Sequence, residues 1–429
     1  MYVFAPFLLC PCIGGRAFLS GIGADLRSAA LVMASQLFLC PFEQASDKGY
    51  RWRYSKSATE ENVNRVSISI SHTTRREHMV QRTDTEAKRD KLQTWLTSKL
   101  PSAEDLSISP LVKASTGYAS EIHFFDLHWQ EAGQEHAEKL VIREEPMALR
   151  VFPVYDMGKE FHTMRCLQGS SVPVPKMYWL EEEDRVLGAP FFVMGKVEGE
   201  IIDPQQVGEE SRGPLYEATP EGRGKIWRQA IEIIAKINTV DWERLGLSFF
   251  GVRKRGTDAL DRQIAFYERM AEWAGVRPKP FLDSAFVWFK KNRFEPKHVS
   301  LCWGDARLGN MMYHNGEVVT ALDWDMTHIG AAEDDLAWLL AVDWLHSESG
   351  LRGPRWEGIP EREEIIRLYE IASKRKLENF SYHEAFAMFK LGIIFWRVIK
   401  TMPGIPPDFA PHNPPLENLG KMLGIDYSL

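Results

Sequence analysis

Residues 299–325, VSLCWGDARLGNMMYHNGEVVTALDWD, decide the fold of this chain. Val299–Trp303 is a short apolar run of the kind that forms a buried strand. It ends at Gly304-Asp305, where a turn-forming residue and an acid mark the start of a loop. The stretch therefore predicts a buried strand that delivers a carboxylate to a loop, with β-rich sequence after it.

A hairpin is predicted directly after this loop. Met311–Tyr313 and Glu317–Leu322 are β-rich runs, and Asn315-Gly316 joins them. Asn-Gly between two such runs is a strong signal for a two-residue hairpin turn. With that turn, we expect Asn310 to lie opposite Ala321.

Three side chains with oxygen atoms should meet at one end of this hairpin: Asp305, Asn310 and Asp323. Magnesium prefers carboxylate and carbonyl oxygens together with substrate phosphates. An isolated Asp or Asn is usually only a turn former, but three at this spacing favour a functional site. For Asp325 a role as a second metal-site residue and one as a solvated neighbour both stay open.

The motif WGDARLGN…LDWD resembles the HGDxxxxN…IDxx signature of the aminoglycoside-phosphotransferase family, which has a protein-kinase-like fold. It is most similar to the branch that includes kinase domains joined to acyl-CoA dehydrogenases, and the similarity covers roughly residues 105–400. One departure is Trp303, which stands where the signature has an architectural histidine.

The resemblance implies a role for each matching residue. Asp305 would orient the substrate hydroxyl and accept its proton, and Arg307 would neutralise the transferring phosphate. Asn310 and Asp323 would hold magnesium on the nucleotide phosphates. Asp335-Leu336-Ala337 resembles a motif that braces the catalytic loop.

A nucleotide-binding pair is expected upstream. Leu140–Arg143 is a strand that ends in a cation, and Glu160 lies in the helix that follows. They resemble the family's phosphate-binding cation and its acidic partner; an ordinary surface ion pair is the alternative. Lys139 is the rival cation.

Two further segments are assigned to the nucleotide by the resemblance. Ser115, Gly117 and Ser120 would belong to a short loop over the phosphates, although a plain hairpin turn explains them equally well. Val193 and Met194 would belong to a hinge strand that contacts the adenine; an ordinary core strand is the alternative.

The whole pattern predicts an α+β, bilobal, protein-kinase-like fold. A small antiparallel sheet with one helix, Asp156–Gln168, should form the amino-terminal lobe, residues 79–195. The remainder, residues 196–429, should be a mainly helical lobe with the catalytic loop and acceptor site. The strands expected in the sheet are Val112–Lys113, Glu121–Trp129, Lys139–Glu144, Met177–Glu181 and Pro190–Met194. The helices expected in the second lobe are Gly224–Val240, Ala259–Ala274, Phe281–Lys291, Ala332–Ser347, Arg362–Arg375 and Tyr382–Lys400.

Residues 1–78 do not share this pattern. Their apolar runs, Tyr2–Cys12 and Ala29–Phe42, are shorter than the roughly 18 residues of a membrane-spanning helix. Three interpretations of residues 1–78 remain open. The start of the chain is assigned too far upstream and the true start lies near Met79, the segment targets the protein to an organelle, or it is a disordered tail. On each of them we expect residues 1–78 to be dispensable for catalysis.

Composition excludes several classes of function. The net charge of −7, without a basic stripe on any predicted helix, argues against a nucleic-acid partner. The five scattered cysteines are expected to form neither a disulfide framework nor a zinc ligand set, which favours a reducing cytoplasm. Because the apolar runs are too short to span a membrane, we also expect no membrane partner. The sequence leaves the oligomeric state open.

We therefore expect an enzyme that uses ATP (or GTP) and Mg²⁺ to phosphorylate a hydroxyl of a small molecule. The resemblance favours a hydroxyacyl thioester or a similar metabolite as the acceptor. A regulatory nucleotide-binding pseudokinase is the main alternative, and a metal-dependent hydrolase is a third.

Overall fold

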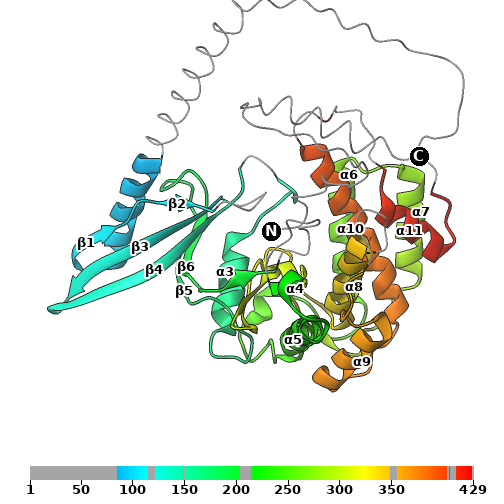
Figure 1. Cartoon of the computed structure of the whole chain (residues 1–429). Helices are drawn as coiled ribbons and strands as arrows, with labels where there is room; N and C mark the ends of the chain where they lie inside the picture. The colour runs from blue at the N-terminus through cyan, green and yellow to red at the C-terminus, as the bar shows by residue number, and fades with distance from the viewer. Residues whose placement is uncertain are drawn as a thin grey trace, which may run out of the picture.

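The computed structural model describes residues 85–114, 121–147, 150–202, 214–347, 355–402, 405 and 412–427. A β-sheet lobe and a larger helical lobe lie side by side (Figure 1). Residues 1–78 and the predicted loop with Ser115, Gly117 and Ser120 lie outside the described residues. No helix within the described ranges is long and apolar enough to cross a membrane.

The small lobe is built on an antiparallel sheet with the strand order β1-β3-β4-β6-β5, in which β2 also pairs with β3. The strands are β1 (Glu104–Ile108), β2 (Val112–Lys113), β3 (Glu121–Glu131), β4 (Gln134–Glu144), β5 (Met177–Glu181) and β6 (Phe191–Gly195). The sheet therefore has one strand more than the five predicted. The sequence EDLSI of β1 is short and polar, Asp105 has a positive φ of 53°, and the pairing with β3 is irregular, so no period-2 pattern marked this strand.

The two faces of the sheet pack against different helices. Leu140 and Ile142 of β4 lie in one apolar cluster with Leu92 and Trp95 of the helix at residues 85–99. Val141 points the other way, into a second cluster that contains Phe161 of α3 (Met157–Leu167). Because side chains alternate along a strand, Arg143 shares the face of Val141 and is directed toward α3.

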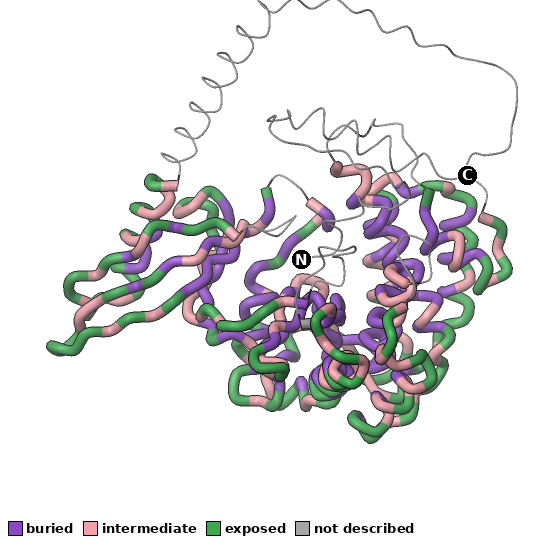
Figure 2. The backbone as a smooth tube through the Cα atoms, in the orientation of Figure 1, coloured by how far each residue is buried: buried purple, intermediate pink, exposed green. Residues whose placement is uncertain are grey.

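The predicted helices of the large lobe are present, with ends that differ by a few residues. They are α5 (Pro220–Thr239), α6 (Asp258–Ala274), α7 (Lys279–Lys291), α8 (Glu333–Ser347), α9 (Arg362–Ser373) and α10 (Phe380–Thr401). The structure adds a short α4 (Pro214–Glu217), the 3₁₀ turns η1 (Leu247–Phe250) and η2 (Leu308–Asn310), and α11 (Pro414–Leu423). Buried residues gather inside this lobe, whereas the far end of the β3–β4 hairpin is exposed (Figure 2).

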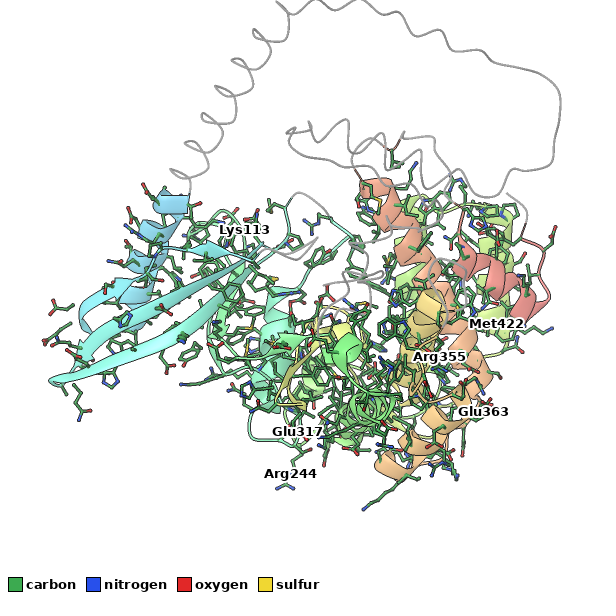
Figure 3. The ribbon with its side chains drawn as sticks, in the orientation of Figure 1. Lys113, Arg244, Glu317, Arg355, Glu363 and Met422 are labelled. Carbon is green, nitrogen blue, oxygen red and sulfur yellow. The ribbon has the colours of Figure 1, made fainter. Side chains whose placement is uncertain are left out.

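The segment quoted at the outset forms two small ladders. β8 (Val299–Cys302) pairs with β11 (His328–Ala331), and β9 (Met311–His314) pairs with β10 (Glu317–Ala321) and with β7 (Glu200–Ile201). The Asn315-Gly316 turn is confirmed, and Glu317 beside it lies on the outer surface (Figure 3).

The predicted register of this hairpin was wrong by one residue. Ala321 pairs with Met311, not with Asn310, because the ladder shifts between Val318 and Thr320. Such an irregularity inserts an extra residue into one strand. Asn310 lies opposite Leu322 instead, whose backbone N–H donates to the Asn310 carbonyl at 2.8 Å.

Candidate active site

Asp305 is the centre of a buried hydrogen-bond network in the loop after β8. Its Oδ2 accepts from Asn310 Nδ2 at 2.7 Å and from Arg307 Nε at 3.0 Å. Its Oδ1 accepts from Trp338 Nε1, on α8, at 2.8 Å. The carboxylate is therefore held by three donors, one of them a cation.

These contacts determine the charge of Asp305. Burial by itself raises the pKa of the carboxyl group, but the Arg307 guanidinium and the donated hydrogen bonds outweigh it, and the pKa of Asp305 is lowered. The group is thus an anion at neutral pH. Arg307 is also buried, and its Nη1 and Nη2 have no hydrogen-bond partner among the described residues.

A second carboxylate fixes the backbone of the loop. Asp335, in the first turn of α8, accepts from the backbone N–H groups of Trp303 at 2.7 Å and Gly304 at 2.8 Å. Gly304 has a φ of 92°, and a Cβ built on it would lie 2.2 Å from the Met326 carbonyl oxygen, so only glycine fits. Asp335 therefore braces the loop, as the resemblance implied.

Trp303 supplies a hydrogen bond where the family signature has a histidine. Its Nε1 donates to the carbonyl of Leu322 at 2.9 Å and to that of Asp323 at 3.2 Å. The ring is fully buried. Trp303 therefore still ties the Asp305 loop to the segment after β10 that carries Asp323.

The predicted ion pair between Arg143 and Glu160 is confirmed, with Nε 3.1 Å from Oε2. Arg143 also reaches across to the second lobe, where its Nη2 lies 3.1 Å from Asp323 Oδ1. All three side chains are at least nine-tenths buried. The rival Lys139 is 66% exposed and pairs with Glu198 on the surface, so it lies away from this cluster.

The oxygen atoms near Asp305 fit a divalent cation. Asn310 donates through Nδ2, and its Oδ1 is buried without a hydrogen-bond partner in the part of the chain that the structure describes. A buried acceptor is rarely left unsatisfied unless water or an ion completes it. Asp323 adds a carboxylate and adopts an uncommon positive φ of 59°. Asp325 Oδ2 is also buried, with no partner among the described residues, which argues against the solvated alternative for this residue.

A pocket opens beside these groups between the two lobes. Its lining includes the polar side chains of Arg143, Glu160, Asn310 and Asp323. Most of the other lining residues are apolar and come from both lobes, among them Ile122, Phe124, Val141, Met164, Phe192, Met194, Ile201, Met312 and Leu322. A mainly apolar pocket with a few polar side chains suits a heterocycle that carries a charged group.

The hinge prediction, in which the backbone of Val193 and Met194 contacts the adenine, stays a prediction, and the two side chains lie on opposite faces of β6. Met194 lines the pocket, whereas Val193 points to the opposite face of β6 and packs with Ile142 in the other core cluster. Side-chain alternation along the strand separates the two neighbours. Since β6 pairs with β4 and β5, the backbone of Val193 also lies inside the sheet.

Sequence reasoning missed several residues of the site. Trp338, which donates to Asp305, looked like an ordinary core aromatic of an apolar helix. Lys390 lies over the Trp338 ring, 5.2 Å from its centroid, and Asn238 donates to Asp335 at 2.8 Å. Lys159 donates from α3 to the carbonyls of Asp325 and Thr327. Only the WGD and DLA motifs marked this region in the sequence.

Comparison with known proteins agrees with this arrangement. Residues 131–380 match the model of the phosphotransferase enzyme family, APH. Acyl-CoA dehydrogenase family member 10 of Mus musculus is 28% identical over 272 residues, 61% of this chain and 24% of that protein. Acyl-CoA dehydrogenase family member 11 of Rattus norvegicus is 24% identical over 312 residues, 70% of this chain and 38% of that protein. The chain therefore spans well under half the length of these relatives.

The fold also has a solved counterpart. A crystal structure of a "putative aminoglycoside phosphotransferase" from Ralstonia eutropha superposes with a TM-score of 0.54 at 24% identity, over 77% of this chain and 93% of that one. This similarity supports the bilobal kinase-like fold. The fold agrees with the family model. Because that model matches more than half of the sequence, the chain belongs to the APH phosphotransferase enzyme family.

Proposed function

We propose that this protein transfers the γ-phosphate of ATP to a hydroxyl group of a small molecule. The observation that carries the proposal is a pocket lined by Asn310 and Asp323, with Asp305 hydrogen-bonded to Asn310 directly behind it. Asp305 is an anionic base candidate, Asn310 has a buried oxygen without a partner among the described residues, and Asp323 adds a carboxylate. The apolar side chains of the same pocket suit the adenine ring.

Each residue has a separate task in this proposal. Asn310 and Asp323 would hold Mg²⁺, and the bound ion would neutralise negative charge on the nucleotide phosphates. Arg143, fixed by Glu160, would contact the phosphates, and Met194 would contact the adenine.

Asp305 would orient the acceptor hydroxyl and take its proton as the oxygen attacks the γ-phosphorus. Arg307 has two buried guanidinium nitrogens without partners, which suits a role toward the transferring phosphoryl group. Gly309 makes room for that guanidinium, because a Cβ there would lie 2.5 Å from Arg307 Nη1.

The acceptor is proposed only as a class. Similarity to a segment of acyl-CoA dehydrogenase family members favours a hydroxyacyl-type metabolite over an aminoglycoside. A screen of a hydroxyl-metabolite library with labelled ATP and Mg²⁺ tests this directly. Phosphorylated product from a hydroxyacyl compound is the expected result, and product from aminoglycosides alone would overturn the acceptor class.

A regulatory pseudokinase is the second candidate. The observation that favours it is the contact of Arg143 with Asp323, since a cation 3.1 Å from Oδ1 competes with a metal for that oxygen. Calorimetric titration with a non-hydrolysable ATP analogue, with and without Mg²⁺, separates the two. Magnesium-dependent binding together with labelled product supports the enzyme, whereas magnesium-independent binding with no product from the library supports the pseudokinase.

A further inference from the structure

A second group of potential metal ligands lies behind the catalytic loop. Cys302, His328 and Asp334 each offer one ligand atom, and these atoms lie within 4.8 Å of one another. None of the three lines the pocket described above. We propose that they form a structural zinc site that joins the β8–β11 ladder to the start of α8.

The fold brings these residues together from three elements. Cys302 of β8 and His328 of β11 are direct partners in the antiparallel ladder, so their side chains leave the same face. Asp334 lies in the first turn of α8, which begins soon after β11 ends at Ala331. The convergence therefore follows from strand register and a short connection.

The separation of His328 from Asp334 and the burial of all three side chains suit zinc ligation. His328 Nε2 and Asp334 Oδ2 are 3.3 Å apart. Zinc binds nitrogen and oxygen at about 2.0–2.2 Å, so two such ligands at the tetrahedral angle lie about 3.3–3.6 Å apart. The side chains of His328 and Asp334 are 12% and 3% exposed, and Cys302 is fully buried. The cluster is thus largely screened from solvent.

The atoms that would not bind the metal already have the partners expected of metal ligands. His328 Nδ1 lies 3.1 Å from the Met326 carbonyl oxygen, which orients the ring. Asp334 Oδ1 lies 2.7 Å from His383 Nδ1. Backbone carbonyls and second side chains commonly orient metal ligands in this way. A sulfur, an imidazole and a carboxylate favour zinc over magnesium.

The metal-free cluster holds itself together differently. Burial and the neighbouring carboxylates of Asp335 and Asp334 raise the pKa of the Cys302 thiol well above its usual range. The thiol donates to the Ala331 carbonyl at 3.2 Å. On binding, the S–H bond would break, its proton would pass to solvent, and a zinc–thiolate bond would take its place.

The test measures metal on the full-length protein, purified without chelator. The variant Cys10→Ser/Cys12→Ser/Cys40→Ser serves as the reference, so that the thiols outside the described residues cannot contribute. Metal is removed by chelation, and Zn²⁺ or Co²⁺ is added in the presence of excess Mg²⁺. We expect one equivalent of tightly bound Zn²⁺ and a thiolate-to-cobalt charge-transfer band.

Variants of the reference protein assign the site. Cys302→Ala should abolish the cobalt–thiolate band, and His328→Gln should weaken metal binding at least about 10–100-fold. Cys166→Ala, which removes the other thiol among the described residues, should leave both unchanged. Circular dichroism checks that each variant is folded. If Cys302→Ala does not fold, the metal affinity of His328→Gln decides the test.

A folded reference protein that binds no Zn²⁺ and shows no cobalt–thiolate band would overturn the proposal. His328, Asp334 and His383 would then form a hydrogen-bonded chain only. Retention of the band in Cys302→Ala would overturn it equally, because the thiolate would have to lie elsewhere. Neither outcome depends on phosphotransferase activity, so the proposed function is tested separately.

Discussion

The two sides of the candidate site are held by different forces. On the Asp305 side, the loop is fixed by hydrogen bonds between side chains and backbone: Asp335 accepts from the N–H groups of Trp303 and Gly304, and the Trp303 indole donates to the Leu322 carbonyl. On the Arg143 side, Arg143 pairs with Glu160 within the small lobe and with Asp323 across to the helical lobe. The loop therefore keeps its shape through bonds within the helical lobe, whereas the Arg143 side depends on a balance of three buried charges.

The largest expected effect is on catalysis and concerns the loop. Asp305→Asn removes the base but keeps the size of the side chain, so phosphoryl transfer should fall by about 10²–10⁴-fold with magnesium-nucleotide binding nearly intact. Asp323→Ala should instead weaken magnesium-dependent nucleotide binding, since it removes a charged oxygen. Labelled-ATP transfer and calorimetry on both variants check this. Loss of nucleotide binding in Asp305→Asn, with binding and turnover kept in Asp323→Ala, would reverse the roles.

The second effect is on stability and concerns the ion pairs. Arg143→Met leaves Glu160 and Asp323 buried without their cation, and breaking a buried pair in this way costs about 3–5 kcal/mol. Urea denaturation of wild type and variant gives the free energy of unfolding. Arg143→Lys is the matched control: it keeps the charge without the planar fork, so its stability should lie between the two. If Arg143→Met lowers the free energy of unfolding by less than about 1 kcal/mol, the three buried charges do not stabilise the fold as proposed.

A smaller effect is expected from the hydrogen bonds of the Trp303 indole, and a variant that keeps an aromatic ring separates these bonds from the packing of the ring. Trp303→Phe removes the donor to the Leu322 and Asp323 carbonyls, and an unsatisfied buried group costs about 1–3 kcal/mol. Nucleotide affinity with Mg²⁺ should fall as well, because Asp323 loses a restraint. Trp324→Phe is the control, since its indole donates to Ala321 alone. Calorimetry should show reduced affinity only for Trp303→Phe; equal affinities would mean that the bond to Asp323 has no role in binding.

The smallest effect is expected outside the cluster. Lys139→Ala removes an exposed pair with Glu198, and such solvent-screened pairs contribute little to stability. Unfolding and nucleotide titration should both resemble wild type. A marked loss of nucleotide affinity would restore Lys139 as the phosphate-binding cation in place of Arg143.

The sequence alone determined the features that depend on local spacing. The Asp305–Asn310–Asp323 spacing predicted their convergence, Asn315-Gly316 predicted the hairpin, and Arg143 and Glu160 were paired correctly. Turn chemistry and side-chain periodicity act within a few residues, so they are visible in sequence. The family, and with it the bilobal fold, was indicated by the resemblance of WGDARLGN…LDWD to the aminoglycoside-phosphotransferase signature.

Tertiary structure decided what depends on contacts between distant segments. The hydrogen bond of Trp338 to Asp305 spans 33 positions, and the ion pair of Arg143 with Asp323 spans 180. The register shift between β9 and β10 and the packing of Val193 into the core cluster of Leu140 and Ile142 depend on neighbouring elements. No local pattern records which distant atoms meet, because burial and hydrogen-bond satisfaction are properties of the packed chain.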